Sequence, residues 1–236
     1  MVRLAIRGLV AFGLLVAAVG AASAQGTESD RRPRGEAGRF DFYVLSLSWS
    51  PSFCAKRAER MDGRDAPSGE CGTHAYGFIV HGLWPQYERG FPQYCEVPSP
   101  RLARSMVSTM LDLMPAPRLV YNEWDRHGTC SGLSPRDYFD TVRTAHAAIK
   151  IPPQYLDLQS PLIVSPAAVE DAFISANPDL ARADMAIDCE AGRLTELRLC
   201  LSKGLKFRAC PQVAADTCRR PRVLMPPMQA AVPGGR

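Results

Sequence analysis

The chain contains 236 residues, with 28 lysines and arginines against 24 aspartates and glutamates and a formal net charge of +4. This length supports one sizeable hydrophobic core and hardly a second. The near balance of charge argues against a protein that holds nucleic acid through a broad basic surface, so any such partner would bind in a local cleft.

The first residues have the pattern of an export signal. Arg3 and Arg7 precede an almost unbroken apolar run from Gly8 to Gly20, and Ala22-Ser23-Ala24 supplies the small residues of a cleavage site. The run is shorter than the roughly 20 apolar residues that span a bilayer. We therefore expect residues 1–24 to be a signal peptide that is cleaved off, rather than a retained helix or a membrane anchor. The remaining 212 residues would have a net charge of only +2.

Two strands are predicted in the first part of the mature chain. Residues 25–39 are polar and charged, which favours a flexible lead-in over a nucleic-acid-binding arm. A strand is expected over Phe42–Trp49, where strand-forming residues continue until Pro51. A second short strand is expected over Tyr76–Val80, with Gly82 among the residues that end it.

Four helices are predicted in the middle of the chain. The first, Pro100–Met114, has apolar residues at spacings of three and four. The second, Tyr121–His127, is closed by Gly128. Ser134 and Ser165 are each followed by proline, which predicts two helix starts with serine as the N-cap and proline in the first turn.

The last third of the chain is predicted to form strands and then a tail. The strands are expected over Met185–Cys189, Leu194–Leu201 and Leu205–Cys210. Residues 219–236 are rich in arginine and proline and are expected to be a loose tail. Residues 40–218 would then form a single disulfide-bonded α+β domain, a mainly antiparallel sheet flanked by helices.

All eight cysteines follow the predicted cleavage site. An even number in an exported chain argues for four disulfides formed in an oxidising compartment. No Cys-x-x-Cys pair is present, which gives little support to a metal ribbon or a redox motif. Eight cysteines can pair in many ways, so their spacing leaves the connectivity open.

Two of the four histidines lie in short motifs rich in apolar and aromatic residues. These are Ile79-Val80-His81-Gly82-Leu83-Trp84-Pro85 and Glu123-Trp124-Asp125-Arg126-His127-Gly128-Thr129-Cys130. On the predicted helix, Glu123, Arg126 and His127 share one face because they are three and four residues apart. Such a face can be an ordinary salt-bridged surface. However, Cys95 lies shortly after the first motif and is the natural disulfide partner of Cys130, at the end of the second. Such a disulfide would give the rigid support that catalysis needs.

Two histidines with a carboxylate and a guanidinium can transfer protons at an anionic centre. A neutral histidine can take a proton from a hydroxyl nucleophile while a protonated one gives a proton to the leaving oxygen. Arg126 can bind a phosphate oxygen through paired hydrogen bonds, and Glu123 can orient an imidazole and favour its protonated form. RNA carries its own nucleophile in the 2′-hydroxyl. The residues therefore predict RNA cleavage without a metal or another cofactor, to a 2′,3′-cyclic phosphate and then a 3′-phosphate.

The two motifs resemble the active-site segments of the ribonuclease T2 family. The likeness extends to Leu47-Ser48-Trp49-Ser50-Pro51-Ser52-Phe53-Cys54, to the predicted strand Leu194–Cys200 and to the last cysteines, and it spans roughly residues 40–218. It implies an exported, disulfide-bonded, metal-independent endoribonuclease that cuts single-stranded RNA with little base preference.

The resemblance also implies roles for individual residues. His127 would be the general base on the 2′-hydroxyl and His81 the general acid toward the 5′-oxygen, with Glu123 and Arg126 polarising the phosphate. Many members have lysine where this chain has Arg126, and lysine does not form the paired hydrogen bonds of arginine. Some members have a third histidine where this chain has Asn122, so its phosphate-binding role is not transferred.

The resemblance further implies the disulfide pairing. The implied bridges are Cys54–Cys71, Cys95–Cys130, Cys189–Cys218 and Cys200–Cys210, the last two nested.

Two other functions compete with this interpretation. His81, Glu123 and His127 could hold a divalent ion in a metal phosphodiesterase, although the neighbouring cation Arg126 would repel the metal. Alternatively, the chain could be an inactive family member that only binds RNA. The presence of all four presumed active groups disfavours that alternative.

Residues that bind the bases are harder to identify, and so are the compartment and the oligomeric state. Trp49 and Tyr76 are candidates because aromatic rings stack on single-stranded bases, but Trp49 also fits a core position on its strand. We expect a monomer, exported to the periplasm or the medium.

Overall fold

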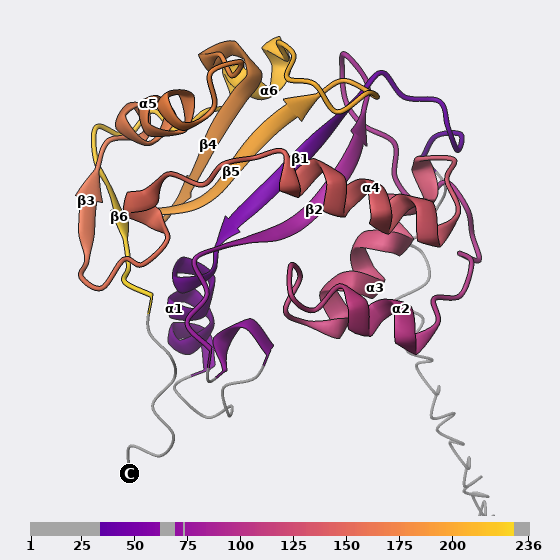
Figure 1. Cartoon of the computed structure of the whole chain (residues 1–236), viewed down its shortest axis with the longest axis horizontal. Coiled ribbons are helices and arrows are strands. Elements are labelled where there is room, and N and C mark those ends of the chain that lie inside the picture. Colours follow the sequence, from indigo (N-terminus) through magenta and orange to yellow (C-terminus); the bar gives the residue numbers. More distant parts are fainter. Residues whose placement is uncertain (1–33, 62–68, 73, 229–236) are drawn as a thin grey trace, which may run out of the picture. The chain divides into compact units, whose positions relative to one another are not determined.

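The computed structural model describes residues 34–61, 69–72 and 74–228 (Figure 1). Their strands form one sheet in the order β2-β1-β5-β6-β3, with β4 also paired to β5. Every pairing is antiparallel except that of β5 with β6. The predicted α+β class is therefore confirmed. The strands are β1 Phe42–Trp49, β2 Phe78–Gln86, β3 Leu162–Val164, β4 Met185–Glu190, β5 Arg193–Leu201 and β6 Val223–Met225.

Helices lie around this sheet, and α4 crosses in front of β1 and β2 in Figure 1. Apolar side chains of α4 and α5 pack into the main core with those of the central strands. Among the described residues, no helix has the length and apolar character needed to cross a membrane. The helices are α1 Ser50–Met61, α2 Arg104–Thr109, α3 Pro117–Arg126, α4 Pro135–Ala147, α5 Pro166–Ala176 and α6 Pro211–Ala215.

Side chains of β1 alternate between two faces of the sheet that are covered differently. The odd-numbered residues from Tyr43 to Trp49 are buried in the main core. Phe42 and Val44 lie on the opposite face, in a small cluster with the Cys200–Cys210 disulfide. Because successive strand residues point to opposite faces, β1 can contribute to the core and to a more open surface at the same time.

A β-bulge in β2 changes the direction of His81. Ser46 of β1 pairs with Gly82 and Leu47 pairs with Val80, so that His81 is the extra residue of the bulge. Val80 is fully buried in the main core, whereas His81 lines a pocket. The prediction that this strand ends near Gly82 is therefore wrong.

The same strand also accommodates a proline. Pro85 lies opposite Tyr43, and β2 forms one end of the sheet order. Proline is tolerated on an edge strand because its missing N–H can face away from the sheet. The strand therefore continues to Gln86.

The two serine N-caps are confirmed. Ser134 Oγ accepts a 3.2 Å hydrogen bond from the Asp137 N–H, and Ser165 Oγ accepts one of 3.1 Å from the Ala168 N–H. In each helix the proline that follows the serine occupies the first turn. Both helices start here because the serine side chain caps the first turn and the proline has no backbone N–H that would need a hydrogen-bond acceptor.

Other predicted boundaries differ from the structure. The helix expected over Pro100–Met114 is only the short α2, in which the Thr109 hydroxyl donates to the Met106 carbonyl and competes with helical bonding. The structure has no strand over Leu205–Cys210, where one was expected. Leu205 has a φ of +59° in a turn, and only an isolated bridge at Phe207 follows.

The described parts of the expected lead-in and tail make contacts within the fold. Arg34 pairs its backbone with Gln93 through hydrogen bonds of 2.8 and 3.0 Å. In the expected tail, Val223 and Met225 of β6 are buried, because this apolar segment within a proline- and arginine-rich region completes the sheet. The predicted signal peptide, residues 25–33 and residues 229–236 lie outside the described residues.

All four implied disulfides are confirmed. The Cys54–Cys71 bridge joins α1 to the segment before β2. The Cys95–Cys130 bridge links the segment after β2 to the end of the second motif, and the remaining two link β4 and β5 to the segments around α6. The bridges are Cys54–Cys71, Cys95–Cys130, Cys189–Cys218 and Cys200–Cys210.

Candidate active site

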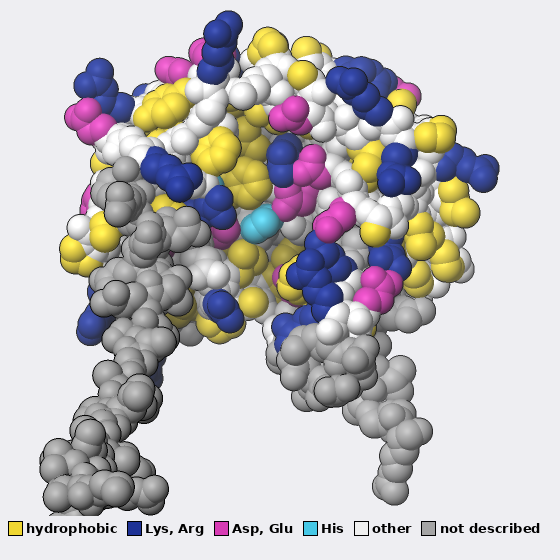
Figure 2. All heavy atoms as spheres, turned by 180° about the vertical axis from the view of Figure 1, so that it is seen from behind, with side chains coloured by type: hydrophobic (Ala, Val, Ile, Leu, Met, Phe, Trp, Pro, Cys, Tyr) yellow, Lys and Arg dark blue, Asp and Glu magenta, His cyan; other side chains and the backbone are white. Residues whose placement is uncertain are grey.

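A pocket of about 300 Å³ brings both histidine motifs together. Figure 2 shows the face behind that of Figure 1, with a histidine side chain in a central hollow among hydrophobic, acidic and basic side chains. The basic side chains on this face are interspersed with acidic ones. The lining residues are Val44, His81, Trp84, Gln86, Phe91, Gln93, Glu123, Arg126, His127, Glu196, Arg198, Gln212, Val213 and Asp216.

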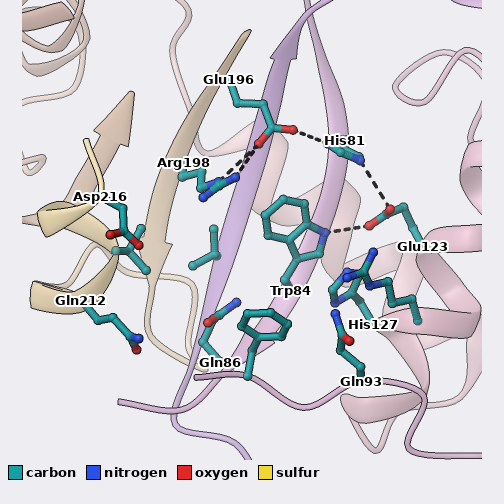
Figure 3. Close-up of a pocket in the computed structure, with 14 residues that line it drawn as sticks. His81, Trp84, Gln86, Gln93, Glu123, His127, Glu196, Arg198, Gln212 and Asp216 are labelled. Carbon is teal, nitrogen blue, oxygen red and sulfur yellow. Dashed lines mark hydrogen bonds and ion pairs between the residues drawn. The ribbon is translucent and has the colours of Figure 1, made fainter. Parts of the chain in front are cut away.

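Trp84 lies close to both histidines. Its ring centroid is 5.3 Å from the ring of His81, in an edge-on arrangement, and 5.3 Å from that of His127, in a stacked one. Figure 3 shows the three side chains side by side. The two imidazoles therefore come from motifs far apart in the sequence and share one crevice.

Glu123 lies next to His81 and is almost fully buried. Its Oε1 is 3.6 Å from His81 Nε2, and its Oε2 accepts a 2.7 Å hydrogen bond from Trp84 Nε1. Burial raises the pKa of Glu123, although the charges of His81 and Arg126 and the hydrogen bond from Trp84 oppose this effect. Both oxygens of the carboxylate thus face groups of the first motif.

Gly82 makes this close approach possible. A Cβ at position 82 would lie 2.1 Å from Glu123 Oε2 and 2.4 Å from Trp84 Nε1, far inside any real contact distance. Only glycine therefore allows the carboxylate and the indole to meet over this strand.

The second motif is positioned by α3 and its C-terminus. The helix starts at Pro117, four residues before the expected start, and His127 is its C-cap, donating its backbone N–H to the Glu123 carbonyl. Arg126 also lines the pocket. With its amide oriented to satisfy both groups, Gln93 accepts from Arg126 Nε at 2.7 Å and Nη2 at 2.5 Å. The predicted proximity of Glu123, Arg126 and His127 is confirmed.

His81 has a carboxylate at each ring nitrogen. Its Nδ1 is hydrogen-bonded to Glu196, and its Nε2 faces Glu123 (Figure 3). Burial by itself lowers the pKa of His81, but the hydrogen bond to Glu196 and the charges of Glu123, Glu196 and Glu70 together raise it above the ordinary value. The protonated form of His81 is therefore favoured.

His127 has the opposite electrostatic surroundings. Burial, together with the positive charges of Arg126 and His81, lowers the pKa of His127 to about 3. Its Nδ1 has no hydrogen-bond partner among the described residues. The neutral form of His127 is therefore favoured, whereas the surroundings of His81 favour its protonated form.

Sequence reasoning missed Glu196 and Arg198 of β5. They occupy alternate positions between the leucines of that strand and point into the pocket (Figure 3). The alternation of Leu197, Leu199 and Leu201 was a usable signal, because it implies that the intervening residues share the opposite face. Whether that face is solvent or a site depends on which strands are neighbours.

The far wall of the pocket was also missed. It includes Gln86 and Phe91 and, from the region of α6, Gln212 and Asp216. Gln212 is positioned by accepting a 2.7 Å hydrogen bond from the backbone N–H of Gly90. Gln86 is the last residue of β2, and the other three come from a loop and the region of a short helix, which carry no periodic pattern.

The two aromatic residues proposed to bind bases are absent from the pocket lining. Trp49 is fully buried in the main core, where its Nε1 donates a 3.0 Å hydrogen bond to the Pro226 carbonyl, so the proposed base contact is wrong. Trp49 is buried because it is one of the odd-numbered residues of β1, whose side chains all point into the main core. Tyr76 is half-buried and packs against His74, with ring centroids 5.9 Å apart, outside the set of residues that line the pocket.

The residues of the metal-hydrolase alternative do not form a metal-binding group in the described part of the chain. Within residues 34–61, 69–72 and 74–228, no three or more His, Cys, Asp or Glu side chains are arranged to hold a metal ion. His81 is instead hydrogen-bonded to the carboxylate of Glu196. Glu123 accepts a hydrogen bond from the indole of Trp84, and His127 stacks on that indole.

Comparison with curated proteins gives related ribonucleases. A ribonuclease of Aeromonas hydrophila is 44% identical over 105 residues, which is 44% of each chain. A probable ribonuclease of Haemophilus influenzae is 34% identical over 124 residues, covering 49% of this chain and 46% of the relative. The matched region thus spans less than half the length of these relatives.

Solved structures share the fold. An RNase-related protein from Calystegia sepium has a TM-score of 0.60 at 21% identity, covering 80% of this chain and 98% of that one. Ribonuclease MC1 from bitter gourd seeds has a TM-score of 0.53 at 16% identity, covering 70% and 91%. The model of the ribonuclease T2 family matches residues 40–210. Since this match includes both histidine motifs and most of the described chain, the protein belongs to the ribonuclease T2 family.

Proposed function

We propose that this protein is an endoribonuclease that cleaves single-stranded RNA through the 2′-hydroxyl, without a metal ion and with little base preference. The products would be 2′,3′-cyclic phosphates and then 3′-phosphates. The observation that carries the proposal is the pair of imidazoles in one pocket with opposite electrostatic surroundings, His81 between carboxylates and His127 beside cations.

The two environments support distinct roles for the histidines. A neutral His127 is ready to accept the proton of the 2′-hydroxyl as it attacks the phosphorus. A protonated His81 is ready to give its Nε2 proton to the departing 5′-oxygen. Each proton transfer of this kind typically accelerates a reaction about 10²–10⁴-fold. In the second step, with water as the nucleophile, the two histidines would exchange roles.

The charged groups beside the histidines would act on the phosphate. Gln93 holds Nε and Nη2 of Arg126, which leaves Nη1 of the guanidinium to donate to a phosphate oxygen and stabilise the extra negative charge of the pentavalent species. Glu123, beside Nε2 of His81, would favour the protonated imidazole.

The substrate and the compartment follow from the same interpretation. A mixed-charge pocket with an aromatic ring and amide side chains suits unpaired nucleotides better than a stiff duplex. A mutant of ribonuclease MC1, which shares the fold at a TM-score of 0.53, has been solved in complex with 5′-UMP. The four disulfides support export to an oxidising compartment, the periplasm or the medium.

The test compares matched RNA and 2′-deoxy oligonucleotides in the presence of EDTA. We expect cleavage of the RNA alone, with a 2′,3′-cyclic phosphate as the first product end, because the deoxy strand lacks the nucleophile. Loss of activity in EDTA that zinc or manganese restores would favour the metal phosphodiesterase. Binding of RNA without any cleavage would favour the inactive family member.

A further inference from the structure

A second carboxylate, distinct from Glu123, holds the other side of the His81 ring. Glu196 Oε1 is hydrogen-bonded to His81 Nδ1. The Glu196 side chain is only 12% exposed, compared with 35% for His81. Figure 3 shows Glu196 on the side of the ring opposite Glu123. Nε2, the nitrogen that faces Glu123, remains available for proton transfer.

Glu196 is itself held on both oxygens. Nε and Nη2 of Arg198 each lie 3.2 Å from Oε2, and Arg198 also forms an ion pair with Asp188 of β4. The Ser48 hydroxyl donates a 3.4 Å hydrogen bond to Oε1, the oxygen that faces His81. Asp188, Arg198, Glu196 and His81 therefore form a continuous chain of charged contacts that reaches the ring.

The sheet brings these residues together over β1. Glu196 pairs with Ser48 of β1, and Arg198 pairs with Ser46. His81 comes from β2, on the other side of β1, through its bulge. Because the two β1 residues between them are serines, the longer side chains can meet above the central strand. A large side chain at either position would separate Glu196 from the imidazole.

We propose that Glu196 is a positioning residue that fixes the orientation and tautomer of His81. A carboxylate at Nδ1 holds a proton on that nitrogen and stabilises the imidazolium, so that Nε2 presents its proton to the leaving oxygen. The inference deepens the proposed function, because it assigns the support that a general acid at position 81 needs.

The charges around the ring agree with this role. Burial alone would raise the pKa of Glu196, but the hydrogen bond and charge of His81 and the charge of Arg198 lower it to about 2, so it stays ionised. Glu123 of α3 and Glu70 of the turn before β2 are the other acidic groups that act on His81. Glu196 is the one that contacts Nδ1.

The test compares Glu196→Gln, Glu196→Ala and a control, Glu190→Gln. Glu190 is on the neighbouring strand β4, is paired with Lys56 and is absent from the active-site lining. In Glu196→Gln, Arg198 should attract the amide oxygen, so that the NH₂ group faces Nδ1 and opposes its protonation. We expect kcat to fall about 10–100-fold with little change in KM, and at least as far in Glu196→Gln as in Glu196→Ala. The control should match the wild type.

The pKa of His81 is measured separately by NMR titration without substrate. We expect a lower pKa in Glu196→Gln than in the wild type, and a basic limb of the pH–rate profile that moves to lower pH. An unchanged His81 pKa, or a kcat equal to that of the wild type, would overturn the inference. A wild-type protein that leaves RNA intact would overturn the proposed function instead, while the titration would still decide whether Glu196 controls the ring.

Discussion

Oε2 of Glu123 accepts a 2.7 Å hydrogen bond from the indole Nε1 of Trp84, so a side chain of α3 is tied to one of β2. The same carboxylate has its other oxygen 3.6 Å from His81 Nε2. This contact joins the two motifs through side chains, and the Cys95–Cys130 disulfide supports the second motif covalently. A small displacement of Glu123 would therefore change the surroundings of the acid and the position of the indole on which His127 stacks.

Gly82→Ala should impair catalysis more than folding. A methyl group at this position would lie 2.1 Å from Glu123 Oε2 and would push the carboxylate away from His81 and Trp84. Misplacement of a catalytic group by about 1 Å can cost about 10²-fold, and we expect a fall in kcat of that order. Gly204→Ala is the matched control, since its Cβ would meet only Ser202 Oγ at 3.8 Å. Equal rates for both variants would contradict the importance of this contact.

His127→Phe should abolish cleavage and leave the fold intact. The phenyl ring can keep the stacking on Trp84, but it has no nitrogen to accept a proton. Initial rates on RNA should fall by at least about 10²–10⁴-fold, while circular dichroism and RNA binding stay close to those of the wild type. His74→Phe is the control, because His74 lies outside the pocket lining. A His127→Phe variant with normal turnover would remove the proposed base.

The dependence of kcat/KM on pH should be bell-shaped and broad. His127 must be neutral, and its pKa of about 3 means that the rate rises as the pH increases through this value. His81 must be protonated, and its pKa above the ordinary 6.5 means that the rate falls only at a pH higher than that. Both limbs are read from kcat/KM because it reports the groups of the free enzyme. A rate that climbs steadily to pH 10 would be inconsistent with His81 as the acid.

Trp49→Ala should destabilise the protein without weakening RNA binding. The indole is fully buried and donates a hydrogen bond to the Pro226 carbonyl. Removal of such a side chain costs about 3–5 kcal/mol in the free energy of unfolding, which denaturant titration would measure. KM at a temperature where the variant is folded should equal that of the wild type, and Trp49→Phe should lose less stability. A raised KM with unchanged stability would return Trp49 to the list of base-binding candidates.

Local patterns predicted those parts of the fold that neighbouring residues decide. The serine caps at Ser134 and Ser165 follow from hydrogen bonds within one helical turn. Strand β1 follows from a run of strand-forming residues with the predicted bounds. Predicted element boundaries were wrong for two reasons. At Thr109 the side-chain hydroxyl hydrogen-bonds to the helix backbone, which competes with the helical pattern. At Gly82 and Pro85 the pairing of β2 with β1 continues the strand beyond its predicted end.

The amino-acid sequence by itself determined which candidate catalytic groups this protein has. The spacing of Glu123, Arg126 and His127 on one helix, the first motif around His81 and the likeness to a known family were sufficient for the proposed reaction. Tertiary structure alone decided that Glu196 reaches His81 and that Trp49 is buried in the core. The reason is that a strand's own residues do not encode its neighbours in the sheet, and one bulged residue at position 81 changes the face to which side chains point.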